Sequence, residues 1–151
     1  MTSPIWYKEY TLETLQSDID VANQGRNILA SLGIEITDIK ADALIGTMPS
    51  DERTHQIYGI LHGGATCVLA ETIGSVAAIM CIDATEYTAV GSMITANHLR
   101  PTASGLVTAT AKPVHLGKTK HVWDIPVTNE QGKLVAKCEL TCAIIPKPKK
   151  A

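Results

Sequence analysis

The stretch GGATCVLAETIGSVAAIMC, from Gly63 to Cys81, is the longest helical segment that the sequence predicts. Apolar residues occupy nearly its whole circumference between Val68 and Met80. A helix that is apolar on every side is buried rather than amphipathic. In a chain of 151 residues, the rest of the sequence is therefore expected to wrap around this helix.

The segments on either side of the helix carry the pattern of β-strands. Six strands are expected, two before the helix and four after it: 34–40, 43–48, 89–99, 106–116, 120–128 and 133–145. In the last of them, apolar and polar residues alternate with the period of a half-buried antiparallel strand. The simplest packing is an α+β fold in which a curled antiparallel sheet wraps around the long central helix. One face of such a single layer stays uncovered, which predicts a homodimer.

Two further helices are expected ahead of the first strand, over residues 11–15 and 20–32. Gly33 follows the second one and suits the left-handed conformation that commonly ends a helix. Between the second strand and the central helix, residues 49–61 are expected to form a polar loop. This order of elements fits a single domain over residues 1–145.

Composition and charge exclude several functions. The chain has 13 basic and 15 acidic residues, and its net charge of −2 does not favour a nucleic-acid partner. The short basic tail, residues 146–151, is expected to be a disordered end rather than a nucleic-acid-binding arm. No apolar run approaches the roughly 20 residues that span a bilayer, and the N-terminus lacks the pattern of a secretory signal. These features predict a cytoplasmic protein with no membrane partner.

The four cysteines and five histidines do not show the spacing of a metal site or a disulfide framework. Cys138 and Cys142 lie four residues apart on one predicted strand, about 13 Å, whereas a disulfide needs Cα atoms about 4.4–6.8 Å apart. All four cysteines are therefore expected to be small buried side chains. The histidines are spread over separate elements, so neither a metal nor another cofactor is predicted.

The residues that can carry chemistry are densest between His55 and Ser75. His62, Gly63 and Gly64 stand where the polar loop becomes the central helix. The N-terminus of a helix presents unpaired N–H groups and a partial positive charge. Two glycines allow another group to approach this backbone closely. The turn is therefore suited to binding a carbonyl oxygen or an oxyanion.

Glu71 is a lone carboxylate in an otherwise apolar helix, two and a half turns after His62. Burying an ionised carboxylate is unfavourable unless it is compensated, which suggests that Glu71 has a function. Ser75 lies one turn further along the same face, where its hydroxyl can bind a water molecule or the carboxylate. Each residue also fits a plain structural role: Gly63 and Gly64 in a tight turn, His62 in a loop, Glu71 on an exposed strip, and Ser75 bonded to the carbonyl of Glu71.

Several segments resemble one family, the hotdog-fold thioesterases of the phenylacetate-degradation type. The matching segments are RTHQ at residues 53–56, GILHGGA at 59–65, LAETIGSVA at 69–77, ANHLR at 96–100 and KPVHLG at 112–117. They keep the order of the family and extend over most of the chain. Many relatives carry Asn and Asp in place of Gln56 and Glu71. The Gln–Glu pairing favours the branch that hydrolyses aryl-CoA thioesters, such as dihydroxynaphthoyl-CoA in menaquinone biosynthesis, with a relative in the enterobactin pathway.

The resemblance implies a hydrolase that pairs into homodimers, further assembled into homotetramers, with active sites between paired subunits. Glu71 would be the nucleophile or general base, facing the loop of the partner subunit. Gln56 and the backbone N–H of Gly63 would polarise the thioester carbonyl. His62 would help to hold the thioester end, and Ser75 would position the hydrolytic water. Direct attack by Glu71 and activation of water by Glu71 both remain open.

The resemblance also implies where the CoA part of the acyl-CoA substrate binds. The candidates are Gly91, His98 and Arg100, together with the turn formed by His115, Leu116, Gly117, Lys118 and Thr119. Gly117 permits a close approach to the backbone, and Lys118 brings positive charge toward the phosphates. The plainer interpretations are a strand glycine or bulge for Gly91, a surface ion pair for Arg100 and a solvated turn for Lys118.

Two other functions fit the same fold. Hotdog hydratases and dehydratases act on acyl thioesters with an Asp–His or His–Glu pair, and their pattern is not seen here. A non-catalytic acyl-CoA-binding module would usually carry a DNA-binding region, for which the fold over residues 1–145 leaves no room. Hydrolysis of an acyl-CoA thioester is therefore the prediction, and the sequence does not identify the acyl group.

Overall fold

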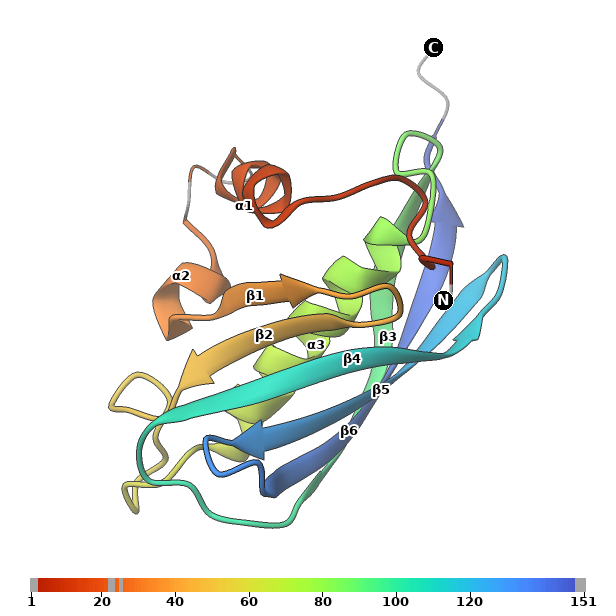
Figure 1. Cartoon of the computed structure of the whole chain (residues 1–151). Helices are drawn as coiled ribbons and strands as arrows, with labels where there is room; N and C mark the ends of the chain where they lie inside the picture. Colours follow the sequence, from red (N-terminus) through yellow and green to blue (C-terminus); the bar gives the residue numbers. More distant parts are fainter. Residues whose placement is uncertain (1–2, 22–23, 25, 149–151) are drawn as a thin grey trace.

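A computed structural model of the chain describes residues 3–21, 24 and 26–148. Its elements are α1 (Leu12–Val21), α2 (Ile28–Leu32), β1 (Glu35–Ile39), β2 (Leu44–Pro49), α3 (Gly63–Met80), β3 (Tyr87–His98), β4 (Leu106–Leu116), β5 (Lys120–Asn129) and β6 (Leu134–Pro146). The strands form one curled antiparallel sheet with the long helix α3 lying along it (Figure 1). The predicted α+β arrangement is therefore confirmed.

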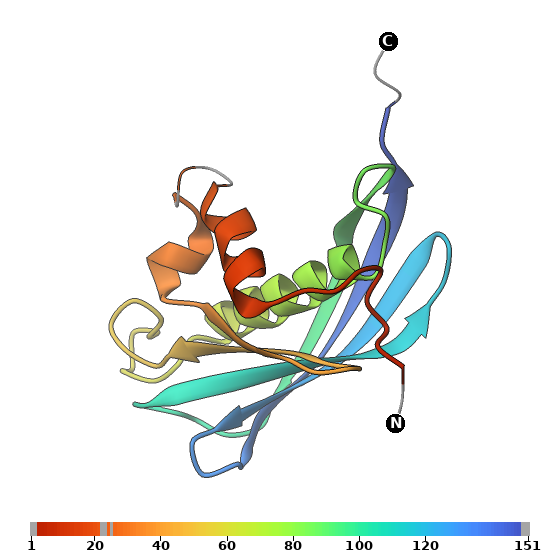
Figure 2. The same ribbon diagram turned by 45° about the horizontal axis from the view of Figure 1, so that its top comes forward.

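The strand order of the sheet places β3 at an edge. The order is β1-β2-β4-β5-β6-β3, and every neighbouring pair is antiparallel. Figure 2 shows α3 crossing the concave side of the sheet, with α1 and α2 near β1. Because β3 pairs only with β6, its other edge is free of backbone partners among the described residues.

The core lies between α3 and the sheet. Leu69 and Ile73 of α3 are fully buried, as is Leu140 of β6. Gly74 approaches the sheet so closely that a Cβ there would lie 2.7 Å from the Leu140 side chain and 2.8 Å from that of Ile125. The absence of a side chain at Gly74 therefore allows α3 to pack directly on β5 and β6.

The prediction that α3 is buried on every side is wrong for one strip of the helix. The strip consists of Gly64, Val68, Glu71, Ser75 and Ile79, which recur every three or four residues and are all exposed or half-buried. By length and composition α3 is apolar enough to cross a bilayer, but here its inner face packs on the sheet. A single sheet covers only one side of a helix, so the opposite strip stays open.

The helix predicted over residues 20–32 is also wrong. α1 is longer than expected and ends at Val21, whereas α2 begins only after Asn27. The side chain of Asn27 accepts a hydrogen bond from the Ala30 N–H and so starts a separate helix. Gly33 ends α2 with φ of +68°, as predicted. Residues 22, 23 and 25 of the predicted helix, and residues 149–151 of the predicted tail, lie outside the described residues.

All four cysteines are free thiols. Cys138 and Cys142 are buried as predicted, while Cys67 and Cys81 are only half-buried. Burial raises the pKa of Cys81 to about 12 and that of Cys138 to about 11. These two thiols therefore stay protonated at neutral pH and are poor nucleophiles.

The substitution Leu140→Ala should lower the free energy of unfolding by about 2–5 kcal/mol, because Leu140 is fully buried against α3. Leu106→Ala is the matched control: Leu106 is 44% exposed, and its loss should change the free energy by about 0.5 kcal/mol or less. Urea denaturation followed by circular dichroism measures both values. Equal losses would contradict a core centred between α3 and β6.

Candidate active site

The predicted site residues fall into three groups along α3. They are the N-terminal group (Gln56, His62, Gly63, His98 and Arg100), the middle group (Glu71, Ser75 and Gly91) and the turn group (residues 115–119). The 18 residues of α3 span about 27 Å at 1.5 Å per residue. Within one subunit, the N-terminal and turn groups therefore lie at opposite ends of the helix.

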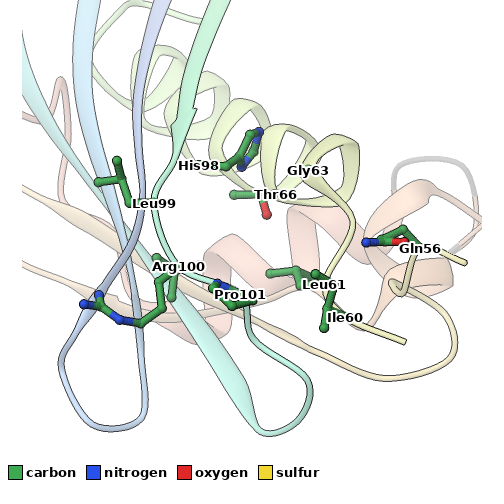
Figure 3. A pocket seen from close by; sticks show the side chains of 10 residues that line it. Gln56, Ile60, Leu61, Gly63, Thr66, His98, Leu99, Arg100 and Pro101 are labelled. Atoms are coloured by element: carbon green, nitrogen blue, oxygen red, sulfur yellow. The ribbon is translucent and has the colours of Figure 1, made fainter. Parts of the chain in front are cut away.

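A cavity of about 420 Å³ opens at the N-terminal end of α3. Its lining comes from the loop before α3, the first turn of α3, the end of β3 with the segment after it, and the start of β6 (Figure 3): Gln56, Ile60, Leu61, Gly63, Thr66, His98, Leu99, Arg100, Pro101 and Val135. The fold thus brings Gln56, Gly63, His98 and Arg100 of the N-terminal group together around one space, although they come from segments that are far apart in the sequence. His62 is not part of this lining.

The side-chain amide of Gln56 is oriented by the backbone of its own loop. Its Oε1 atom accepts a hydrogen bond of 2.7 Å from the Tyr58 N–H. This bond assigns the oxygen of the amide, so the NH₂ group is the one left to donate. Figure 3 shows the nitrogen on the side of the cavity. Gln56 therefore presents a hydrogen-bond donor to whatever binds there.

His62 caps the N-terminus of α3. Its Nδ1 atom accepts a hydrogen bond of 2.7 Å from the Gly64 N–H. Because Nδ1 accepts, neutral His62 carries its proton on Nε2 and keeps one donor. His62 therefore has a structural role at the start of the helix as well as an N–H that a ligand can use.

Gly63 lies against the ring of His98. A Cβ on Gly63 would be 2.9 Å from His98 Nε2 and 3.1 Å from Cε1, so only glycine leaves room for the imidazole. The N–H of Gly63 belongs to the first turn of α3, where backbone donors have no partner within the helix. His98, which was predicted as a contact to CoA, thus lies directly beside the turn predicted to bind the carbonyl oxygen.

Arg100 lines the same cavity and is held by the backbone. Its Nη1 atom donates a hydrogen bond of 2.6 Å to the Leu134 carbonyl. The ion pairs among the described residues do not include Arg100, so the surface ion pair considered as its plainer role is not formed. The guanidinium has five N–H donors in total, and those not used by Leu134 can meet an anion.

In the middle group, the Glu71 carboxylate lies against Gly91 of β3. A Cβ on Gly91 would be 2.6 Å from Glu71 Oε1. The register of β3 against β6 shifts at this point, between Gly91 and Met93, which marks a β-bulge. Within the single subunit Glu71 is exposed, which matches the plainer interpretation that it lies on an exposed strip of the helix. Gly91 was predicted as a contact to CoA, and the structure places it beside the carboxylate.

Two thiols that were not predicted to belong to the site lie close to Glu71. Burial raises the pKa of Cys67 and of Cys142, and the charge of Glu71 raises both further. A hydrogen bond between Ser75 and the Cys142 thiol acts in the opposite direction on the pKa of Cys142. Cys142 pairs with Gly91 across the β3–β6 ladder, a contact that no local sequence pattern reveals.

The turn group borders a second cavity, of about 530 Å³, beyond the C-terminal end of α3. Leu116, Gly117 and Lys118 line it. A Cβ on Gly117 would lie 2.5 Å from His115 Nε2, so the room that this glycine creates is taken by a neighbouring imidazole. Thr119 accepts a hydrogen bond from the Ile144 N–H through its carbonyl, which attaches the turn to β6.

His121 lines this second cavity and was not predicted as a site residue. It is 4% exposed, and its Nδ1 atom has no hydrogen-bond partner among the described residues. Burial lowers the pKa of His121 and nearby His115 lowers it further, while a hydrogen bond with the Gly117 backbone opposes the shift. The alternation of β5 indicates that His121 faces inward, but the sequence does not reveal its missing partner.

The lowered pKa of His121 predicts a pH dependence of stability. The unfolded chain takes up a proton at this residue near pH 6.5, where the folded chain does not, so acid favours the unfolded state. The stability that comes from keeping His121 neutral is fully present above about pH 6.5. It is lost as the pH falls toward the pKa of His121 in the folded chain. We expect the free energy of unfolding to fall between pH 7 and pH 5.5, and less steeply in His121→Phe. Urea titrations at several pH values measure both slopes, and equal slopes would contradict this role of His121.

Comparisons with known proteins identify the family of this chain. The family model of the Thioesterase superfamily matches residues 58–136. The 1,4-dihydroxy-2-naphthoyl-CoA hydrolase of Escherichia coli K12 is 43% identical over 141 residues, which cover 93% of this chain and 99% of that protein. The proofreading thioesterase EntH of Klebsiella pneumoniae is 39% identical over 140 residues, which cover 93% and 98%.

Solved structures show the same fold. A mutant thioesterase from Pseudomonas aeruginosa matches with a TM-score of 0.88 and 43% identity, over 95% of this chain and 99% of that one. A Staphylococcus aureus thioesterase, solved with a glutamine replaced by alanine, matches with a TM-score of 0.76 and 34% identity, over 79% and 98%. With its sheet, its central helix and these relatives, the chain belongs to the Thioesterase superfamily and is a hotdog-fold enzyme that hydrolyses thioesters.

Proposed function

We propose that the chain hydrolyses acyl-CoA thioesters with an aromatic acyl group, the class to which 1,4-dihydroxy-2-naphthoyl-CoA belongs. One observation carries the proposal: the Gln56 amide donor and Gly63, the first residue of α3, line one cavity. The hydrolase of E. coli at 43% identity supports the substrate class. The Gln–Glu pairing supports the same branch of the family.

The donors of the N-terminal group bind the thioester carbonyl. Its oxygen accepts hydrogen bonds from the Gln56 NH₂ and from the Gly63 N–H. Negative charge develops on this oxygen as the carbonyl carbon is attacked, and both donors then bind it more strongly. The positive end of the α3 dipole acts in the same direction.

The carboxylate for this reaction is supplied by a second subunit. Glu71 follows Gly63 by eight residues, which places it about 12 Å further along α3. Reacting atoms must approach to about 3–3.5 Å, so Glu71 cannot reach a carbonyl held at Gly63 of its own chain. The separation supports an active site shared between two copies.

The edge strand β3 is the surface that suits this pairing. Its outer edge has no strand partner within residues 3–21, 24 and 26–148, and Val90 and Met93 on it are 48% and 55% exposed. An unpaired edge with exposed apolar side chains is a template for association. Two-fold pairing of β3 edges reverses the direction of α3 in the second copy. The middle and turn groups of one copy then approach the N-terminal group of the other.

Glu71 of the partner subunit acts on the bound thioester in one of two ways. It attacks the carbonyl carbon and forms an anhydride that water hydrolyses, or it removes a proton from a water molecule that attacks instead. Ser75 lies beside it to hold that water. In both routes CoA leaves as the thiol and the acyl group as the carboxylic acid. Arg100 and the turn group bind the phosphates of CoA.

Glu71→Gln preserves the shape of the side chain but removes the base and nucleophile. We expect kcat for an aromatic ester such as benzoyl-CoA to fall by about 10²–10⁴-fold, while binding of the ester persists. Thiol release measures kcat, and calorimetry measures binding. Glu139→Gln, an exposed carboxylate of β6, is the control and should keep its activity. Wild-type turnover by Glu71→Gln would overturn the mechanism, and faster turnover of acetyl-CoA than of benzoyl-CoA by the wild type would overturn the substrate class.

Mixing two variants that each have reduced activity tests the shared site. In a dimer of one Glu71→Gln chain and one Gln56→Ala chain, one of the two sites combines both changes and the other is intact. Co-refolding equal amounts gives half mixed dimers, so about a quarter of wild-type activity should return. Each variant refolded alone is the control. Activity that stays at the level of the separate variants would show that each subunit contains its whole site.

A further inference from the structure

Gln56 belongs to a tight loop whose base is a β-bridge between His55 and Leu61. Inside the loop, the Gln56 N–H donates to the Ile60 carbonyl at 2.9 Å, and the Gly59 N–H donates to the Gln56 carbonyl at 2.9 Å. Gly59 has φ of +74°, which lets the chain reverse over so few residues. The position of Gln56 therefore follows from where the two residues at the base are held.

Both strands of this base are attached to the same carbonyl group, that of Thr102 in the segment between β3 and β4. On one strand, the Leu61 N–H donates to it at 2.8 Å. On the other, the Ser50 hydroxyl donates to it at 3.0 Å, and the same hydroxyl oxygen lies 3.2 Å from His55 Nε2. Ser50 is itself fixed, because its N–H donates to the Gly105 carbonyl at 2.8 Å.

The direction of the His55–Ser50 hydrogen bond can be assigned. The Ser50 hydroxyl has one proton, which the Thr102 carbonyl accepts, so the Ser50 oxygen must be the acceptor at His55. His55 therefore carries a proton on Nε2 and donates it. Ser50 is 4% exposed, so water has little access to replace this donor. A buried acceptor that loses its partner destabilises the arrangement that buries it.

We infer that His55 is a positioning residue for hydrolysis, because its Nε2–H bond to Ser50 holds the base of the Gln56 loop. This role depends on the proposed function of Gln56 as a donor to the carbonyl. The same segment also fixes the start of α3, since the His62 N–H donates to the Thr54 carbonyl at 2.8 Å. The distance between the two donors proposed to bind the carbonyl, the Gln56 amide and the Gly63 N–H, is thus set from both ends of the loop.

Two substitutions of His55 separate the hydrogen bond from the size of the side chain. His55→Phe keeps a ring but removes the donor. We expect kcat to fall about 10- to 100-fold, a loss of the size that a small misplacement of a catalytic group causes. KM should change about twofold or less, because Gln56 acts on charge that develops after binding. His55→Gln retains an N–H donor at similar reach and should recover most of kcat. Melting temperatures confirm that each variant is folded. If His55→Phe does not fold, Ser50→Ala removes the bond to His55 together with the one to Thr102 and should lower kcat at least as much.

A double-substitution cycle shows whether His55 acts through Gln56. In the Gln56→Ala background, His55→Phe should have no further effect on kcat, because the group that it positions is already absent. If the loss in kcat of the double variant equals the product of the two single losses, His55 does not act through Gln56 and the positioning role is overturned. Wild-type kcat in Gln56→Ala alone would overturn the proposed function instead.

Arg53→Gln is the control for general disturbance of the loop. It removes the exposed ion pair of 2.7 Å with Asp51 but leaves the Ser50–His55 bond in place. Its kcat should stay within about twofold of the wild type, since exposed ion pairs contribute little. A loss as large as that of His55→Phe would show that any change in the loop lowers activity, and would overturn a specific role for His55.

Discussion

A single sheet can cover only one side of a helix, and the organisation of the site follows from this constraint on α3. Leu69, Ile73 and Gly74 face the sheet and make the helix the rigid centre of the fold. The opposite strip stays open and carries Glu71. The carboxylate is therefore attached to the best-packed helix and is still accessible. Beside this carboxylate lies the edge of β3, which has no strand partner in the described part of the chain. Under the proposed function, the surface that favours association is therefore also the surface that presents the carboxylate.

Space for polar groups is created by glycines on different elements. Gly91 makes room for the Glu71 carboxylate on the edge strand, and Gly63 makes room for His98 at the start of α3. In both places a Cβ would come within 3 Å of the side chain that now fills the space. Because backbone hydrogen bonds of a strand or helix hold both glycines, the side chains beside them meet a surface with little freedom to move. The site is thus shaped as much by missing side-chain volume as by the groups that act.

Patterns within one element could be read from the sequence, whereas contacts between elements could not. The length of α3, the alternation of β6 and the end of α2 at Gly33 follow from local spacing and were predicted correctly. The sequence offered an exposed strip at Glu71 only as an alternative to complete burial. The choice between them depends on strand order, because β3 pairs with β6 and so becomes an edge. The contact of Glu71 with Gly91 requires both that pairing and a bulge. The break before α2 depends on one capping side chain, Asn27, within a stretch that otherwise reads as helical. The roles of the site residues remain predictions from the family resemblance.

Under the proposed function, dividing the site between two chains solves an electrostatic difficulty. Acidic side chains bind readily to the free N–H groups at a helix N-terminus. If a flexible carboxylate side chain of the same subunit could reach Gly63, it would therefore occupy the donors that the substrate needs. About 12 Å of helix keeps Glu71 away from them within its own subunit. Across a paired β3 edge, the distance between Glu71 of one subunit and the donors of the other is set by the packing of two backbones rather than by one side-chain rotamer. A gap of the width of a thioester carbonyl can then persist, and the substrate rather than the carboxylate satisfies Gln56 and the helix N-terminus.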